Sequence, residues 1–490
     1  DLEKINLAQD IPTLLKNTPS VITTSFPGAG IGYSSIRVRG SDPSRVNVTI
    51  NGVPYNDSES MGVYWVNLPD FASSVESIQI QRGVGTSTNG SAAFGGSLNI
   101  QTNAASDIAT FEINNTLGSF STIKNSVGFS TGFINDKFEL SGRLSRIKSG
   151  GYIDRSGSKL RSYFLQGVYK DSNTLLKLLN FAGHELTDQA WFGIDASTLE
   201  SNRKYNPAGE YYDKNGDIKY YNNQDEDYKQ DHYQIHWNQS YKNGWISNFG
   251  LHYTYGRGYY ESYNVAYDTN LSDNIDRRWL DNNFYGLIFS LNDKSDDYNA
   301  IIGGSYNKYE GQHFGEYLWY ADSNKLNNYK EKFYDDYGNK SEFNFYAKLD
   351  YYLSQKLSIY GDLQFRNINY NASITPYSVI LGYVEQGYEK IDKKFNFFNP
   401  KIGLFYNKNE NNQLYMSYAR AQREPTRADY ANGSPDPEKL DDFELGWRRT
   451  FSSFSINLNA FYMLYDDQLV LTGERDINGY EIRTNVGESY

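Results

Sequence analysis

The sequence contains no cysteine and only five histidines among its 490 residues. Without cysteine the chain has no disulfide framework, no thiolate metal site and no thiol redox chemistry. It also lacks any apolar run of roughly 18 residues, which excludes a membrane-spanning helix. No charged segment leads into an apolar segment at the N-terminus, so no signal peptide is visible and we expect a mature or incomplete chain.

Positive charge is also scarce. The chain carries 47 Lys and Arg against 59 Asp and Glu, and its formal net charge is -12. Nucleic acid is therefore not an expected partner, because phosphate binding needs concentrated Lys and Arg. The sequence offers no GxxxxGK[ST] motif, no GxGxxG motif that opens a helix, and no catalytic triad order or carboxylate pair. We therefore predict that the chain is not an enzyme.

Aromatic residues, in contrast, are abundant. They make up 16% of the chain, with 45 Tyr and 27 Phe. Tyr suits a boundary at which one end of the side chain is apolar and the other is wet. The mean hydropathy of -0.68 would suit a soluble protein. It does not exclude a membrane, because transmembrane β-strands alternate lipid-facing with lumen-facing residues.

From about residue 109 the chain shows a sustained two-residue periodicity. In EFNFYAKLDYYL, Phe343, Phe345 and Leu349 share one face, whereas Asn344 and Lys348 share the other. The segments LSIYGDLQFRNI, FELSGRLSRI and SFSINLNAFYML repeat this pattern. Each lasts about ten residues, the length that a tilted strand needs to cross a bilayer.

The connections between these segments alternate between short and long. The short ones are the polar turns INDK, KDSN, YKNGW, NDKSDD, LSQK, NKNENN and TFSS. We expect the long loops at residues 184–229, 257–276, 312–340, 371–394, 421–439 and 466–479. This asymmetry is typical of an outer-membrane barrel and not of a soluble sandwich or propeller. We count 15 or 16 strands before Tyr490, and expect that closing the barrel requires further strands, because an open edge is not viable in lipid.

The first hundred residues have a different character. Short expected strands, SSIRVRG, RVNVTING, VESIQIQRG and GSLNIQT, follow an expected helix in LAQDIPTLLKNTP that ends at Pro19. The stretch RGVGTSTNGSAAFGGSLNI, residues 82–100, is built almost entirely of small residues, which suits close approach of one backbone to another. A large barrel has a lumen that needs a plug. We therefore divide the chain into a plug domain, residues 1–104, and a transmembrane β-barrel, residues 105–490, whose last strands are missing.

The order of these motifs resembles a known family. SSIRVRGSDPSRVNVTINGVPYND, followed by VESIQIQRGVGTSTNGSAAFGGSLNIQT, is similar to the plug of TonB-dependent outer-membrane receptors. The segments YMSYARAQREPTRADY and KLDDFELGWRR resemble barrel segments of the same family, and GHELTDQAWFG resembles a loop of its Bacteroidetes members. The resemblance implies an all-β membrane protein: an antiparallel transmembrane barrel of about 22 strands with an N-terminal α+β plug inside its lumen.

The resemblance also implies a function in the bacterial outer membrane. Such receptors import a scarce nutrient with energy from the TonB–ExbB–ExbD complex, which pulls on a TonB box that we do not find in this sequence. The expected cargo is an iron–siderophore complex, haem or cobalamin. The alternatives are a glycan or peptide importer that works with a surface lipoprotein, and a structural, adhesive or secretion-associated barrel without coupled import. Outer-membrane lipid and a small or oligomeric nutrient are the remaining expected partners.

Two sets of site residues follow from the resemblance and from the residue types. The first is a plug–barrel lock, in which plug arginines pair with a barrel glutamate; its candidates are Arg39, Arg82, Glu444 and, as a substitute, Arg37. The second is a set of aromatic ligand contacts at the apex of the plug and in the long loops, because rings that face a cavity can stack on a ligand. Its candidates are Tyr33, Tyr55, Tyr64, Trp65, Trp191, Trp319 and Tyr320.

No metal site is expected. His232 and His236 lie on one face of an expected strand, but four residues along a strand span roughly 13 Å, too far for one metal ion. The segment DKNGD at 213–217 is similar to part of a calcium loop and lacks the full acidic pattern and the distal Glu. A loop-bound calcium ion is the one cofactor that this segment leaves open.

Overall fold

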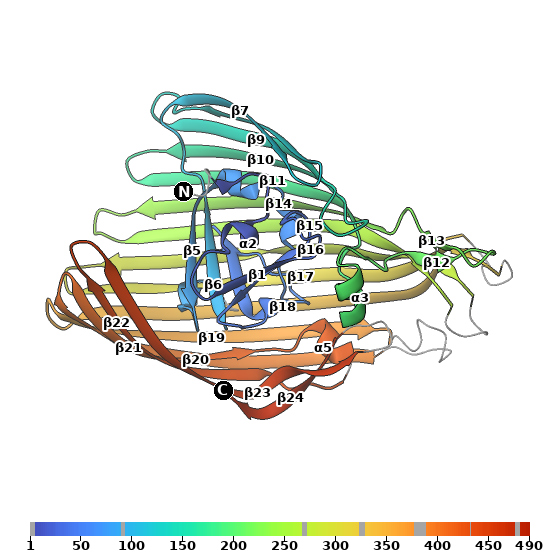
Figure 1. Ribbon diagram of the computed structural model, residues 1–490. Helices are drawn as coiled ribbons and strands as arrows, with labels where there is room; N and C mark the ends of the chain where they lie inside the picture. Colours follow the sequence, from blue (N-terminus) through green and yellow to red (C-terminus); the bar gives the residue numbers. More distant parts are fainter. Residues whose placement is uncertain are drawn as a thin grey trace.

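The computed structural model describes residues 5–89, 94–266, 272–322, 329–376, 389–431, 433–475 and 481–490. Most of the chain forms one curved antiparallel sheet of sixteen strands, from β7 at one edge to β24 at the other. We call this sheet the wall; in Figure 1 it curves around the N-terminal elements, drawn in blue. Its strands are β7 (Ala109–Gly118), β8 (Thr122–Thr131), β9 (Phe138–Ser149), β10 (Ser158–Lys170), β11 (Thr174–Asp188), β14 (Asp225–Ser240), β15 (Ile246–Asn264), β16 (Asn274–Lys294), β17 (Tyr298–Tyr320), β18 (Glu331–Tyr352), β19 (Leu357–Ile374), β20 (Glu389–Asn409), β21 (Asn412–Arg423), β22 (Glu438–Thr450), β23 (Ser455–Arg475) and β24 (Glu481–Ser489).

The two faces of the wall reverse the usual arrangement of a soluble protein. On β18 and β19, Phe345 and Leu363 are exposed on the outer face, at 40% and 51% of their surface. The polar residues that alternate with such apolar residues along each strand point inward and are buried: Asn344, Gln364 and Arg366 are 3% or less exposed. This confirms the alternation expected from the sequence. An apolar outside around a polar inside is the arrangement that lipid favours.

The short turns are confirmed, but the strands extend further at the other end than the sequence indicates. Residues 257–276 and 312–340 were expected to be loops. Instead β15 continues to Asn264, and β17 and β18 are 23 and 22 residues long. A tilted strand needs only about 9–11 residues to cross a bilayer. The ladder therefore continues beyond the lipid, because backbone pairing between twisted strands needs no apolar face.

The N-terminal residues 5–102, here called the plug, contain short elements only. A four-stranded sheet in the order β4-β3-β6-β5 lies next to the hairpin β1–β2. The expected helix at residues 7–19 is reduced to a single turn. The elements are α2 (Ile11–Leu14), β1 (Val21–Ser25), β2 (Ser34–Val38), η1 (Pro43–Arg45), β3 (Val46–Ile50), β4 (Val53–Pro54), η2 (Trp65–Asn67), η3 (Phe71–Ser74), β5 (Val75–Arg82), η4 (Ser87–Asn89) and β6 (Gly96–Thr102).

The plug fills the concave side of the wall and shares a core with it. Its buried apolar residues, among them Ile36, Leu98 and Ile100, form one cluster with Phe164 and Phe181 from β10 and β11. A second cluster joins Val84 and Phe94 to Leu440 and Met463 of β22 and β23, together with two alanines of β21. Two separate faces of the plug therefore pack dry against the wall.

The glycine-rich stretch has the structural role that its composition indicates. At Gly83, where φ is +71°, an added Cβ would lie 2.5 Å from Asp442 Oδ2 and 2.6 Å from Glu444 Oε1. At Gly95 it would meet Ser41 Oγ. Only glycine allows the plug backbone to approach the wall and its own neighbours this closely. Residues 90–93 of this stretch lie outside the described residues.

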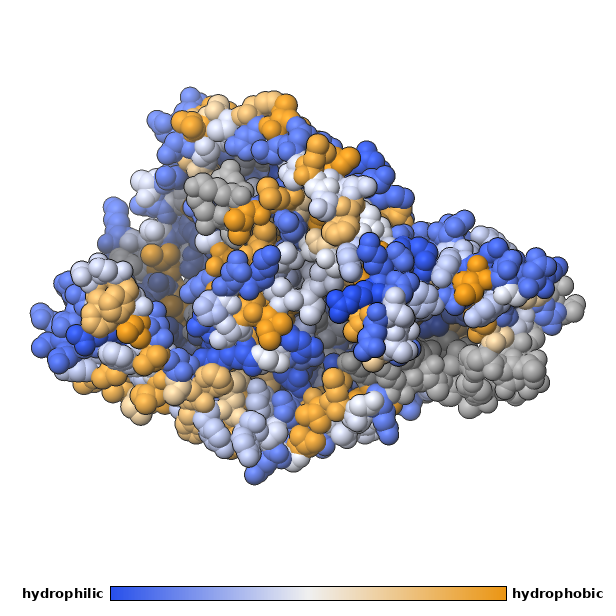
Figure 2. Space-filling model, viewed as in Figure 1, coloured by the Kyte–Doolittle hydropathy of each residue, from blue (hydrophilic) through white to orange (hydrophobic). Residues whose placement is uncertain are grey.

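The long connections carry a few small elements. The segment after β11 contains α3 (Ala196–Ser201) and the hairpin β12 (Glu210–Tyr212)–β13 (Ile218–Tyr220), and α5 (Arg427–Ala431) follows β21. Within the described residues, no helix has the length and apolar character needed to cross a membrane. Hydrophobic residues gather along the lower edge of the molecule in Figure 2, over the outer side of β20 to β23.

Candidate functional site: the aromatic apex and the plug–wall contacts

Three of the predicted aromatic residues meet at the end of the plug that faces the long connections. The ring of Tyr33 lies 6.5 Å from that of Tyr64 and 5.4 Å from that of Trp191, edge-on in both cases. Trp191 belongs to the segment after β11, so the group joins plug to loop. Burial and the nearby carboxylate of Glu185, 3.5 Å from the Tyr33 hydroxyl, raise the pKa of Tyr33 well above its usual value.

The other predicted aromatic residues lie elsewhere. Trp319 and Tyr320 end β17, where Trp319 stacks on Tyr263 at 6.0 Å and Tyr320 packs against Tyr317 at 4.8 Å. They form a second group, and none of their ring contacts within the described part of the chain reaches Tyr33 or Tyr64.

Two of the plug aromatics are not positioned to face a ligand. Tyr55 lies between plug and wall, with its hydroxyl 3.4 Å from Gln230 Oε1 and its ring 5.4 Å from that of His232. Trp65 is 2% exposed and packs in the plug core, so no face of its ring is available to a ligand. This burial does not fit the prediction of Trp65 as a ligand contact.

The structure brings together two of the four residues of the predicted lock. Arg39, at φ +51°, places Nη1 2.5 Å from Glu444 Oε1 of β22. Its Nη2 donates to Asn459 Oδ1 at 2.9 Å, and its guanidinium lies over the ring of Phe461 at 4.2 Å. Asp442, which the sequence did not single out, lies beside this pair and accepts a hydrogen bond from the backbone N–H of Val84 at 3.2 Å.

The remaining two arginines do not join this cluster. Arg37 is 3.7 Å from Asp42 of the plug itself, and its side chain is 40% exposed. Arg82 ends β5 with an exposed side chain, and among the described residues no ion pair connects it to Glu444. The sequence identified the glutamate and one arginine of this contact, but not the second plug arginine that pairs with the wall.

That second arginine is Arg45. Its guanidinium binds Glu438 of β22, which is 1% exposed and also accepts from Arg423 Nη1 at 2.6 Å. Arg45 further donates to the carbonyl of Leu469 at 2.7 Å, and the backbone N–H of Leu469 donates to Glu438 at 2.8 Å. The Glu438 carboxylate is therefore shared between plug and wall and is fully satisfied by charge-assisted hydrogen bonds.

Asp70 forms a third contact on the opposite side of the plug. It has a left-handed backbone conformation, φ +54°, and binds Lys124 of β8 and Arg143 of β9, the latter at 3.1 Å. Asn6 also donates to Asp70 Oδ1 at 3.2 Å. Burial alone would raise the pKa of Asp70, but Arg143 and Lys124 hold it below its usual value.

Glu59 forms a fourth contact, nearer to the long connections. Its carboxylate lies 2.7 Å from His313 Nε2 of β17 and 3.1 Å from Arg427 Nη1 of α5, and accepts from the Tyr370 hydroxyl at 2.6 Å. Burial would raise the pKa of Glu59, whereas His313 and Arg427 hold it well below its usual value. The plug loop around Glu59 is thus bound to both the wall and an external helix.

The predicted calcium segment forms an ordinary turn. Asp213 Oδ1 accepts hydrogen bonds from the backbone N–H groups of Asn215 at 2.9 Å and Asp217 at 3.0 Å. Among the residues that the structure describes, no group of three or more acidic or histidine side chains is arranged to hold a metal ion.

Comparisons with known proteins agree with this architecture. Residues 1–97 match the TonB-dependent receptor plug domain, and residues 195–490 match the TonB-dependent receptor-like β-barrel. The vitamin B12 transporter BtuB of Vibrio vulnificus is 31% identical over 153 residues. That alignment covers 31% of this chain and only 24% of the relative.

Solved structures show the same fold at low sequence identity. The copper transporter OprC superposes with a TM-score of 0.76 at 13% identity, over 98% of this chain and 73% of its own. The ferric citrate transporter FecA gives 0.73 at 15% identity, over 95% and 69%. The barrel match alone spans more than half of the sequence. The chain belongs to the TonB-dependent receptor family, whose members are non-enzymatic proteins of the bacterial outer membrane.

Proposed function

We propose that this chain imports a scarce nutrient across the outer membrane in a step powered by the TonB–ExbB–ExbD complex. The observation that supports this most is the plug itself, which fills the lumen side of the wall and is held there by ion pairs. Salt bridges and short hydrogen bonds can break and re-form without loss of the fold, provided that outside work supplies their energy.

The division of the chain supports the same proposal. The last plug strand, β6, ends at Thr102 and the first wall strand, β7, begins at Ala109. We propose that a boundary at 104/105 separates a movable plug from a fixed barrel, and that Arg39 with Glu444, joined by Arg45 with Glu438, is the lock between them. The resting lock would be the contact that the energy complex must release.

Cargo would bind at the aromatic apex. Tyr64 is 44% exposed and lies beside Tyr33 and Trp191, where plug and loop meet. Such rings can stack on a porphyrin, a corrin, a catecholate or a sugar. The relatives named above are transporters of vitamin B12, copper and ferric citrate. We propose an iron–siderophore complex, haem or cobalamin as the cargo class, with Trp319 and Tyr320 as outer contacts.

A second candidate is a glycan or peptide importer that works with a surface lipoprotein. It is favoured by GHELTDQAWFG, residues 183–193, which ends β11 and begins the connection after it. This stretch is similar to Bacteroidetes receptors and contributes Trp191 to the apex. The long β16–β18 extensions would give such a lipoprotein a platform.

Growth of a deletion strain on single sources tests the proposal. Defined media would supply iron as a siderophore complex or as haem, cobalamin, a glycan or a peptide. Loss of growth on one source, restored by the wild-type gene and not by a Tyr33→Ala/Tyr64→Ala/Trp191→Ala variant, would identify the cargo class and the apex together. Normal growth of the deletion strain on every source would contradict an importing role.

A further inference from the structure

Four basic residues lie together on the outer face of the wall, two on β9 and two on β10. We call them the basic quartet: Arg146, Lys148, Lys159 and Arg161. All four are exposed, whereas residues that alternate with them, such as Ile147 and Leu160, are 1% and 0% exposed and point inward. The strand pairing sets the two arginines directly opposite each other, and likewise the two lysines.

The protein does not supply counter-ions for this quartet. Like charges directly opposite each other on two strands destabilise the pairing. Among the residues that the structure describes, no ion pair links any of the four to an acidic side chain. Acidic side chains on the neighbouring strands are bound elsewhere: Asp188 accepts from the backbone N–H of Gly157 at 2.8 Å, and Asp227 lies 2.8 Å from His184. The pairing of β9 with β10 therefore carries an electrostatic cost.

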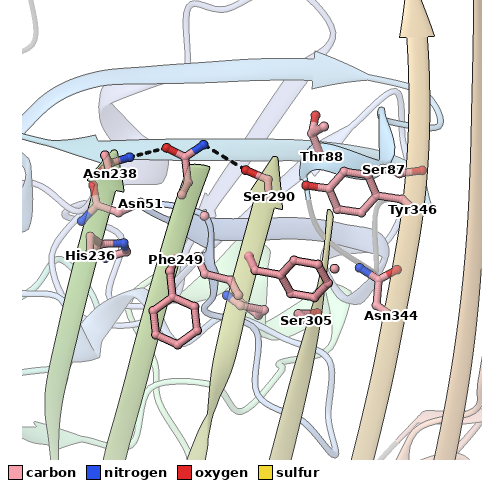
Figure 3. Close-up of a pocket in the computed structure, with 16 residues that line it drawn as sticks. Asn51, Ser87, Thr88, His236, Asn238, Phe249, Ser290, Ser305, Asn344 and Tyr346 are labelled. Atoms are coloured by element: carbon pink, nitrogen blue, oxygen red, sulfur yellow. Dashed lines mark hydrogen bonds between the residues drawn. The ribbon is translucent and has the colours of Figure 1, made fainter. Parts of the chain in front are cut away.

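Polar side chains in other parts of the wall find partners within the protein. On the outer face, Lys229 of β14 and Arg257 of β15 each lie 2.8 Å from an aspartate. On the inner face, Figure 3 shows the cavity between the plug and the short-turn ends of β14–β18, where Asn248 donates to Ser290 Oγ at 3.0 Å. The contrast with the quartet points to an anion that comes from outside the protein.

The quartet lies at the depth of a lipid headgroup. Along the outer face of β10, Lys159 and Arg161 are followed by Tyr163 and then by Leu165, which is 43% exposed. On β9 the quartet is likewise followed by Leu144, 67% exposed. Tyrosine is enriched at the membrane interface, and the cations beside it are within reach of headgroup phosphates.

The quartet also lies on the outer-leaflet side of the membrane. The opposite ends of β9 and β10 lead into the short turns INDK and KDSN. In outer-membrane barrels the short turns are periplasmic and the long connections are extracellular. A lipid that meets the quartet therefore belongs to the outer leaflet, where the main anionic headgroup is the phosphorylated sugar of lipid A.

The spacing of the quartet suits phosphate. Neighbouring strands lie roughly 4.8 Å apart, and residues two apart on one strand lie roughly 6.6 Å apart. Four long side chains on so small an area can meet at one or two phosphate groups. Arginine presents a planar fork that matches phosphate oxygens, and lysine adds a point charge.

We propose that the basic quartet binds the phosphate groups of a lipid A molecule in the outer leaflet, whose acyl chains lie along the apolar outer surface of β8–β10. The phosphates supply the counter-ions that the protein lacks. Pairing of β9 with β10 is then favourable in the membrane that the receptor inhabits. This inference depends on the outer-membrane location and not on cargo or on the energy complex.

A lipid titration tests the proposal with the natural full-length receptor in detergent. Native mass spectrometry counts bound diphosphoryl lipid A, and lipid A with the same acyl chains but no phosphate is the comparison probe. The quartet variant carries Arg146→Gln, Lys148→Gln, Lys159→Gln and Arg161→Gln. The control variant removes the same number of exposed cations in or next to the short turns: Lys137→Gln, Lys242→Gln, Lys356→Gln and Lys408→Gln.

We expect the wild type and the control variant to bind diphosphoryl lipid A equally and to bind the phosphate-free lipid far more weakly. The quartet variant should lose about fivefold in affinity for each charge removed. Equal affinity of the quartet variant and the wild type, an equal loss in the control variant, or equal affinity for the two lipids would overturn the proposal. Displacement of the lipid by excess inorganic phosphate would assign the quartet to soluble anions and overturn it as well.

Thermal unfolding in detergent gives a second readout that does not depend on counting bound lipid. Without lipid, the quartet variant should be at least as stable as the wild type, because it has lost two pairs of opposed like charges. Added diphosphoryl lipid A should raise the unfolding temperature of the wild type and not that of the quartet variant. A quartet variant that fails to fold, or that unfolds at a lower temperature without lipid, would show that these cations have partners within the protein and would contradict the lipid site.

Discussion

Individual residues, above all Glu438, hold the plug in the lumen. Glu438 is 1% exposed and pairs with two guanidinium groups, one from Arg45 of the plug and one from Arg423 of the wall. Removing one partner of such a site leaves the others as uncompensated buried charge. The strength of the contact is therefore best measured by a substitution that keeps the shape and removes the charge.

We predict that Glu438→Gln lowers the free energy of plug unfolding by about 3–5 kcal/mol. Arg37→Gln is the matched control, because Arg37 is half-exposed and 3.7 Å from Asp42; its loss should cost about 0–1 kcal/mol. Urea titration of the plug, followed by protease susceptibility with the barrel in lipid, measures both variants. Equal effects of the two substitutions would show that the buried contact contributes no more than a surface pair.

The buried carboxyl group of Asp10 should make the stability of the plug fall at alkaline pH. It is buried and accepts from Ser34 Oγ at 2.9 Å, and burial raises its pKa from 3.8 to about 8. Because the folded pKa lies above the unfolded one, the folded plug binds a proton that the unfolded chain releases. Its contribution to stability is complete below pH 3.8 and is lost as the pH rises toward about 8.

The plug should therefore melt at a lower temperature at pH 9 than at pH 6, both values taken at roughly one unit or more from the folded pKa. Asp10→Asn keeps the shape and cannot ionise, so it should remove most of this difference. Differential scanning calorimetry at the two pH values checks it. A variant that is as pH-sensitive as the wild type would assign the effect to another group.

For individual residues, the sequence indicated which kinds of side chain hold the plug better than it indicated which two side chains pair. Arg39 and Glu444 were identified because a family motif carries them, whereas Arg45, Asp70 and Glu59 were missed. Each of these pairs with a side chain far along the chain, such as Glu438 for Arg45. Any lumen-facing charge is a candidate for such a pair, and only the curvature of the wall and the path of the plug decide which two meet.

At the scale of single strands, β18 shows how the wall divides between lipid and water. Phe345 lies on its outer face near the short-turn end, and Tyr337 lies on the same face toward the long connections. Their exposures are nearly equal, at 40% and 39%. If the ladder extends beyond the bilayer, Phe345 faces lipid and Tyr337 faces water, although the two side chains are equally exposed at the protein surface.

We predict that Phe345→Lys destabilises the barrel by about 2–4 kcal/mol and that Tyr337→Lys costs ~0–1 kcal/mol, because a cation is penalised only at membrane depth. Guanidinium unfolding of the receptor in lipid vesicles, monitored by tryptophan fluorescence, measures both. Similar costs at the two positions would contradict the assignment of Tyr337 to the region outside the lipid.

The existence of the strands was the most predictable feature of the fold, and the residues at which the long loops begin and end were the least predictable. Alternation identifies a strand wherever one face meets lipid, as in β18 and β19. Beyond the lipid a strand needs no apolar face, so β15 and β17 extend into segments whose sequence predicts loops. The expected plug helix is also shorter than the sequence indicates: α2 is one turn long, and Ile11 and its C-cap residue Leu15 pack in the plug core.

For the whole molecule, the arrangement of contacts matters more than their number. Ion pairs and apolar packing hold the plug to β8–β11 and to β19–β23, and Glu59 binds His313 of β17; a cavity separates the plug only from the short-turn ends of β14–β18. The sequence could establish that a plug exists, but not which strands of the wall it contacts.

Uptake of labelled cargo by living cells, with and without a protonophore, tests the central claim of an energy-driven, plugged importer most directly. The cargo is the one that the growth panel identifies. We predict that collapse of the proton gradient leaves binding at the cell surface unchanged and abolishes accumulation in the periplasm. Accumulation that continues without the gradient would show an open pore and contradict the account.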